Sequence, residues 1–157
     1  MNGSNPRSTA AIGGHPIHPM IIPFPITCFV GAFITDIFYV SNHAQGWATA
    51  SNWLLGFGLA FAALAAATGL TDYMGDDRIR RLGVALRHML ANVTAVVLEI
   101  VNLVVRLSDQ TKIDSVGIFL SGATVLVLLY SGWLGGELVY RHRVGVQDAG
   151  SDETSRG

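Results

Sequence analysis

Four long runs of apolar residues divide the chain and predict its helices. They cover residues 20–40, 47–70, 84–105 and 116–140. Each run approaches or exceeds the roughly 20 residues that a helix needs to cross a bilayer. The pattern predicts an all-α polytopic membrane protein, in which a bundle of four transmembrane helices occupies residues 15–146. The polar ends, residues 1–14 and 147–157, are expected to be disordered.

The third run carries its polar residues on one face. On a wheel of about 100° per residue, they all fall within roughly 40° of His88. They are Asn92, Glu99, Asn102 and Arg106. A charge that faces lipid near the bilayer centre costs at least a few kcal/mol. We therefore expect this face to point toward the other helices or toward water.

Other polar residues lie at matching depths in the first two runs. Asp36 near the end of the first helix and Asn52 near the start of the second are placed to meet Asn102 and Arg106. We predict that Asp36, Glu99 and Arg106 are buried and that Arg106 offsets at least one carboxylate, because an unpaired charge there is too costly.

Composition and charge support the membrane assignment and suggest an orientation. Half of the residues are hydrophobic and only 13% are charged, which is too apolar for a soluble domain. Nucleic acid is not an expected partner, because no basic patch contains interleaved aromatic residues.

Four spans place both termini on one side, together with the loop between the second and third helices. Seven arginines between residues 7 and 143 fall on that side, so the positive-inside rule predicts that both termini are cytoplasmic.

This topology gathers four of the five histidines at the cytoplasmic interface: His15, His18, His88 and His142. Imidazole is a common axial ligand of haem and a common ligand of transition metals. We predict a haem b or transition-metal site, with His18 and His88 as the preferred haem pair. Asp72, Asn92 and Glu137 are candidate hydrogen-bonding partners that orient the rings. The alternative is that these are ordinary interfacial histidines that bind nothing.

The segment GGHPIHPMIIPFPI, residues 13–26, contains four of the five prolines. A residue before proline is disfavoured in the α region. The first helix is therefore expected to start near Pro19, with His18 just before it.

Small residues recur at helical spacing in the second run, at Gly56, Ala60, Ala63 and Ala67. Such a stripe lets membrane helices pack closely, within the bundle or in an oligomer. Gly132, Gly135 and Gly136 either serve the same purpose or leave room for a planar ligand against the backbone.

The segments GHPIHPMIIPFPI, TGLTD and GWLGGELVYRHRVGV, together with His88 and Asn92, resemble the motifs of a large bacterial family of four-helix membrane proteins, domain of unknown function 2231. The resemblance implies a location in the bacterial inner membrane but no activity. Relatives are sometimes fused to redox domains, which would suit a redox role. The residues at the family's motif positions are His15, His18, Asp72, His88, Asn92, Glu137 and His142.

Three functions remain open from the sequence. The first is haem or metal binding with electron transfer beside a membrane redox partner. The second is a structural or assembly role without a ligand, and the third is a proton or ion path along the polar face of the third helix. No catalytic motif is recognised.

Overall fold

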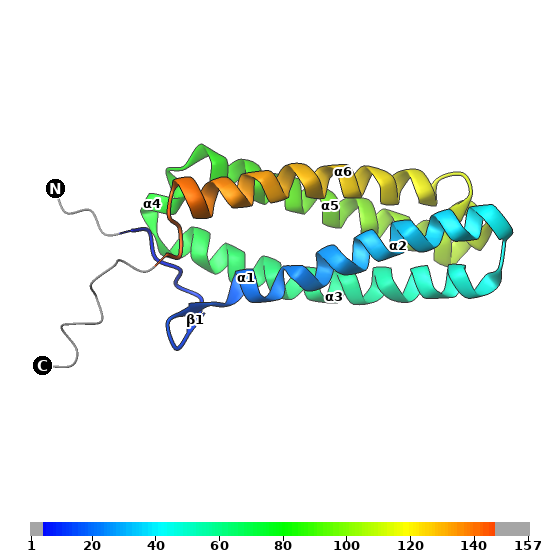
Figure 1. Ribbon diagram of the computed structural model, residues 1–157, viewed down its shortest axis with the longest axis horizontal. Helices are drawn as coiled ribbons and strands as arrows, with labels where there is room; N and C mark the ends of the chain where they lie inside the picture. Colours follow the sequence, from blue (N-terminus) through cyan, green and yellow to red (C-terminus); the bar gives the residue numbers. More distant parts are fainter. Residues whose placement is uncertain (1–4, 147–157) are drawn as a thin grey trace, which may run out of the picture.

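The computed structural model describes residues 5–146, which form an elongated bundle of four long helices (Figure 1). The helices are α2 (Pro23–Asn42), α3 (Gln45–Gly75), α5 (Gly83–Ser108) and α6 (Gly117–Gly136). Four segments are long and apolar enough to cross a bilayer: Ile17–Asn42, Gln45–Gly75, Gly83–Ser108 and Gly117–Arg141. The predicted all-α polytopic membrane bundle is confirmed.

Short elements lie at the ends of the bundle. They are the strands β1 (Ala11–Ile12) and β2 (His15–Pro16), the helices α1 (Ile17–Ile21) and α4 (Asp77–Arg80), the 3-10 helix η1 (Gln110–Ile113) and the π-helical turn η2 (Glu137–Arg141). The two strands pair antiparallel, with Ile12 opposite His15. Gly13 and Gly14 connect them with φ values of 56° and 81°, the left-handed conformation that a two-residue hairpin turn requires.

Residues 5–14, expected to lack order, are held against the end of α3. The Asp72 carboxylate accepts bonds from the backbone N–H groups of Thr9 and Ala10, both at 2.8 Å, and from the Ser8 hydroxyl at 2.9 Å. These bonds satisfy backbone donors that a disordered segment would leave to water. Residues 1–4 and 147–157, also predicted to be disordered, lie outside the described residues.

The first helix begins earlier than its prolines predict. Helix α1 starts at Ile17, so His18 lies inside it rather than before it. Pro19 is tolerated because the first N–H groups of a helix have no intrahelical partner. The first span is interrupted at Ile22, between α1 and α2, where Pro23 and Pro25 remove backbone donors.

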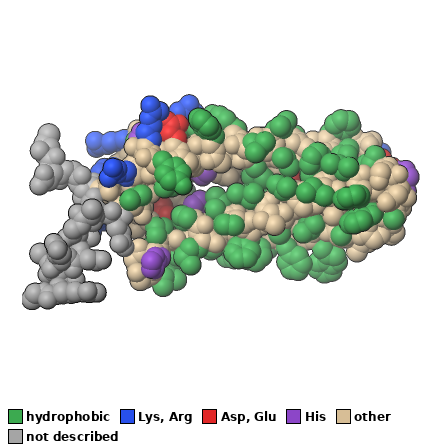
Figure 2. Space-filling view, viewed as in Figure 1, with side chains coloured by type: hydrophobic (Ala, Val, Ile, Leu, Met, Phe, Trp, Pro, Cys, Tyr) green, Lys and Arg blue, Asp and Glu red, His purple; other side chains and the backbone are tan. Residues whose placement is uncertain are grey.

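The helices pack as two hairpins. Helix α2 packs mainly on α3, and α5 packs mainly on α6; the hairpins then meet through α2 with α6 and α3 with α5. The side of α3 that faces the bundle carries small residues such as Ala48, Gly58 and Ala62, which allow a close approach. Large apolar side chains cover the long sides of the molecule (Figure 2), as expected for a surface in contact with lipid.

The predicted small-residue stripe does not pack inside the bundle. Gly56, Ala60, Ala63 and Ala67 are all exposed on α3. The face of α3 that enters the core is a neighbouring one, which contains Ser51, Leu55 and Ala65. A spacing of four residues identified a small-residue face, but it did not identify which face is buried.

Basic side chains gather at the end of the bundle where the chain begins and ends (Figure 2). In the α3–α4 connection, Asp76 accepts bonds from the backbone N–H groups of Arg78, at 2.9 Å, and Arg7, at 3.1 Å. The Arg78 guanidinium also binds this carboxylate at 2.6 Å. Hydrogen bonds from Arg78 hold the pKa of Asp76 well below its ordinary value.

Candidate functional site

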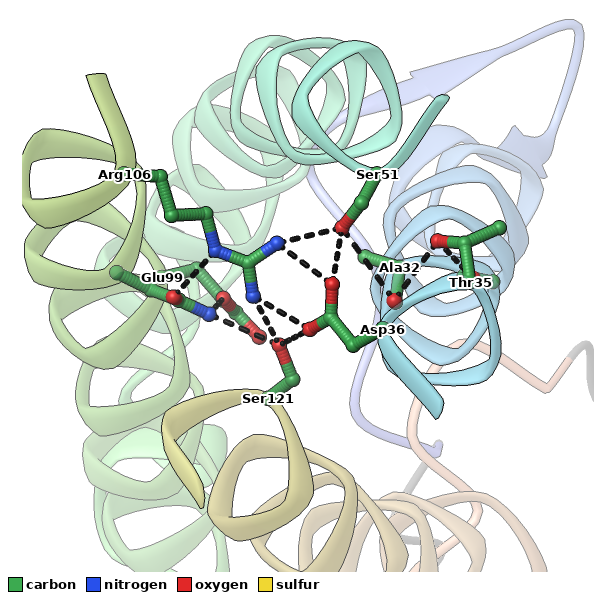
Figure 3. Close-up of polar contacts among 9 residues, drawn as sticks. Ala32, Thr35, Asp36, Ser51, Glu99, Arg106 and Ser121 are labelled. Atoms are coloured by element: carbon green, nitrogen blue, oxygen red, sulfur yellow. Dashed lines mark hydrogen bonds and ion pairs between the residues drawn. The ribbon is translucent and has the colours of Figure 1, made fainter. Parts of the chain in front are cut away.

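A buried ion pair joins the two hairpins at the end of the bundle opposite the chain termini. Arg106 on α5 and Asp36 on α2 are both fully buried. The guanidinium Nη1 lies 2.7 Å from Oδ1 of Asp36, and Nη2 lies 2.5 Å from Oδ2, so the pair is bidentate (Figure 3). A bidentate arginine–carboxylate pair is the strongest common form of charge-assisted hydrogen bonding.

Three neutral side chains complete this ion-pair cluster. Ser51 on α3 and Ser121 on α6 each accept a bond from Arg106 and donate one to Asp36. Asn102 accepts from Nε of Arg106 at 2.7 Å. All four long helices therefore contribute a side chain to one polar layer (Figure 3).

Asn52, expected in this cluster, is only half-buried, and its Oδ1 atom is buried without a hydrogen-bond partner. The preceding residue, Ser51, occupies the predicted place. One residue corresponds to a rotation of about 100° on a helix. The predicted depth along the helix was therefore correct, but the predicted direction of the side chain was wrong.

Glu99 lies about two turns before Arg106 on α5 and less than one turn before Asn102. It is fully buried, and its Oε2 accepts a bond from Asn102 at 2.8 Å. On the side of Glu99 away from the ion pair, α5 continues toward the histidines. An apolar cluster fills part of the core between the helices and includes Phe29, Leu55 and Ala62.

The other end of the bundle holds a pair of histidines. The rings of His18 on α1 and His88 on α5 lie with their centroids 6.3 Å apart and their planes at 86°. Nδ1 of His18 lies 2.8 Å from the carbonyl oxygen of Ala65, and Nδ1 of His88 lies 2.9 Å from that of Ser131. We call His18 and His88 the histidine pair.

These contacts place a proton on Nδ1 of both rings. A carbonyl oxygen only accepts hydrogen bonds, so Nδ1 is the donor in each ring. Nε2 of His88 lies 3.1 Å from the side-chain amide of Asn92, which donates to it. Of the three predicted hydrogen-bonding partners, Asp72, Asn92 and Glu137, it is Asn92 that contacts a ring of the histidine pair.

Glycines allow the rings to approach the helix backbones. A Cβ atom at Gly69 would lie 2.9 Å from Nδ1 of His18, and one at Gly135 would lie 3.2 Å from Cε1 of His88. Gly69 lies four residues after Ala65, whose carbonyl binds His18. Gly135 lies four residues after Ser131, whose carbonyl binds His88. At Gly135 the group against the backbone is the ring of His88, whereas the glycine cluster was expected either to pack helices or to leave room for a planar ligand.

The other predicted site residues have different neighbours. His15 is exposed in the hairpin and His142 is half-buried after η2. Asp72 binds the N-terminal segment, and Glu137 pairs with Arg141 at 2.9 Å. Among residues 5–146, no three His, Cys, Asp or Glu side chains are grouped to hold a metal ion. Of the four predicted ligands, the structure brings His18 and His88 together.

An internal repeat underlies both clusters. His88, Arg106 and Ser121 follow His18, Asp36 and Ser51 by 70 residues in each case. The buried positions agree as well: residues 25, 29, 32 and 36 of α2 correspond to 95, 99, 102 and 106 of α5. The constant spacing was visible in the sequence, and it would have identified Ser51 and Ser121 as members of the site.

The fold, the lipid-facing surface and the buried polar layer define a multi-pass integral membrane protein that contacts the bilayer. The chain belongs to the family described as predicted membrane protein (DUF2231), whose model matches residues 14–148. Neither a curated protein nor a solved structure was found to match it.

Proposed function

We propose that the histidine pair binds haem b and that the protein transfers electrons within the membrane. The observation that carries the proposal is the meeting of two imidazole rings from diagonally placed spans, each held through Nδ1 by a backbone carbonyl. Two imidazoles that bind one metal ion from opposite sides, at about 2.0–2.1 Å each, place their ring centroids roughly 6 Å apart. The observed 6.3 Å agrees with that arrangement.

The protonation of the rings supports the same proposal. Histidines that bind a metal usually donate the other ring N–H to a carbonyl or carboxylate, which fixes the ring and raises the basicity of the free nitrogen. His18 and His88 both donate through Nδ1 to a backbone carbonyl. Iron binding by Nε2 of His88 would replace its bond from Asn92.

The number of ligands favours haem over an isolated transition-metal ion. A structural or catalytic metal site typically needs three or four protein ligands. Haem iron is already held by the four porphyrin nitrogens and needs only two protein ligands, which His18 and His88 would supply. When both axial positions are taken by protein, haem supplies one-electron transfer. The glycines at positions 69 and 135 let the two rings lie directly against the backbones of α3 and α6.

The purified protein, expressed with adequate iron and haem supply, tests the proposal by absorption spectrum and metal analysis. We expect a Soret band that His18→Ala and His88→Ala abolish. His15→Ala, His142→Ala and the matched control His43→Ala should retain it, since His43 lies at the far end of the bundle and pairs with Asp114. A protein without haem or stoichiometric metal would favour the structural role, and a normal band in His88→Ala would contradict the site.

We also propose that the histidine pair lies on the cytoplasmic side of a bacterial inner membrane, near a redox partner. The gathering of basic side chains at that end supports this orientation. Reporter fusions after Gly46 and Gln110 should both give periplasmic signals, and a fusion at the C-terminus should give a cytoplasmic one. A cytoplasmic signal after Gly46 would reverse the orientation.

A proton or ion path is the competing function for the polar face of α5. Flux in proteoliposomes that depends on Glu99 would favour it. The apolar cluster of Phe29, Leu55 and Ala62 lies in the core between the helices, so electron transfer through the histidine pair remains the function we propose.

A further inference from the structure

The ion-pair cluster has no hydrogen-bonding capacity left for another charge. Arg106 has five N–H donors, and all five are used: one by Asn102, two by Asp36 and one each by Ser51 and Ser121. Each oxygen of Asp36 accepts from Arg106 and from one serine hydroxyl. The guanidinium and the carboxylate therefore neutralise each other completely.

A third ionisable side chain, Glu99, contacts this network through Asn102 rather than through Arg106. The buried charged residues among residues 5–146 are Asp36, Glu99 and Arg106. Arg106 makes no hydrogen bond to Glu99, so an ionised Glu99 would leave one uncompensated negative charge in the bundle. Such a charge inside a membrane is costly. Glu99 therefore needs a bound proton or cation that neutralises its carboxylate.

Two buried oxygens next to each other lack partners. Oε1 of Glu99 and Oγ1 of Thr124 on α6 are each buried without a hydrogen bond. Both residues are fully buried. Asn102 on α5 donates to Ser121 on α6, and Glu99 and Thr124 each lie three residues further along this hairpin, so their side chains are neighbours. An unsatisfied buried polar atom costs about 1–3 kcal/mol, so this pair calls for an explanation.

The internal repeat shows that packing does not require a carboxylate here. The counterpart of Glu99 in the first half of the chain is Phe29, which is buried at the equivalent position of α2. The counterpart of Asn102, which binds Oε2 of Glu99, is Ala32. The second half therefore carries an added polar unit, and the ion pair is already complete without it.

We propose that Glu99 and Thr124 form a proton-binding site inside the membrane, separate from the histidine pair and from the ion pair. The proton resides on Oε1 of Glu99 and is donated to Oγ1 of Thr124, while Oε2 accepts from Asn102. A proton fits better than a metal cation, because a cation such as Ca²⁺ takes six or more oxygen ligands whereas a proton is shared by two. The inference goes beyond the proposed haem site and does not depend on it.

Infrared spectroscopy of the protein in lipid nanodiscs at neutral pH tests this site. We expect the carbonyl band of a protonated carboxylic acid in the wild type and its complete loss in Glu99→Gln. The matched control Glu137→Gln should keep the band, since Glu137 is paired with Arg141 near the bundle end. Thr124→Val should keep the band but shift it, because the acid loses its acceptor.

Further measurements separate the remaining explanations. Glu99→Gln should fold normally, because the amide oxygen accepts from Asn102 and the NH₂ group donates to Thr124. The band should also persist in His88→Ala and when sodium is replaced by choline. A folded wild type without the band, a Gln variant that fails to fold, or a band that sodium abolishes would each overturn the proposal.

Discussion

Asp36→Asn is expected to lower the free energy of unfolding by about 3–5 kcal/mol, the typical result of removing one partner of a buried ion pair. Asparagine preserves the shape of the side chain but leaves the Arg106 guanidinium as an unpaired cation in the fully buried cluster. Denaturant unfolding in detergent micelles, followed by circular dichroism, measures the loss. Asp114→Asn is the control, because Asp114 pairs only with the exposed His43 and its loss should change stability by less than about 0.5 kcal/mol.

The internal repeat makes a sharper version of this test possible. Exchanging the charges in Asp36→Arg with Arg106→Asp keeps one cation and one anion between the equivalent serines, Ser51 and Ser121. We expect the double variant to recover most of the stability that either single variant loses. Recovery should be incomplete because an arginine introduced at position 36 would face Ala32, whereas Arg106 binds Asn102. If the stability losses of the two single variants simply add in the double variant, Asp36 and Arg106 do not interact as an ion pair.

Gly58→Ala is the second substitution with a large expected effect. A Cβ atom at this position would lie 2.5 Å and 2.8 Å from two ring atoms of Phe29, and Phe29 is buried in the core. Overpacking of this kind costs about 1–3 kcal/mol.

Gly56→Ala on the same helix is the matched control, since a Cβ there has nothing within 4 Å. Both substitutions gain the same helix propensity, about 1 kcal/mol. The free energy of unfolding of Gly58→Ala should therefore be lower than that of Gly56→Ala by about 1–3 kcal/mol. Equal stabilities would mean that α2 and α3 do not pack as closely as described.

The buried charges could be predicted from the sequence because a membrane leaves a charge few alternatives. The polar face of α5 and the depth of Asp36 were enough to expect the pair with Arg106. Ser51 and Ser121 were missed because a hydroxyl in a membrane helix needs no partner helix. Thr35 and Thr68, for example, bind carbonyls of their own helices.

The histidines show the limit of topology as a guide. The order of the spans sets the depth of a residue in the membrane but not its direction. His18 and His88 share both depth and direction, and their rings meet. His15 lies in a hairpin, and His142 follows a π-helical turn, so neither direction could be deduced from a helical wheel. The contact of Asn92 with His88 was accessible because residues four apart lie on one helix face.

Haem titration of the cofactor-free protein in nanodiscs tests the central claim, that His18 and His88 act together as two ligands of one group. We expect saturation at one haem per chain, with a six-coordinate bis-imidazole spectrum. Either His18→Ala or His88→Ala should convert it to the spectrum of a single imidazole ligand or abolish binding, whereas His43→Ala should match the wild type. Binding that is unchanged in both His18→Ala and His88→Ala, or no binding by the folded wild type, would contradict the account.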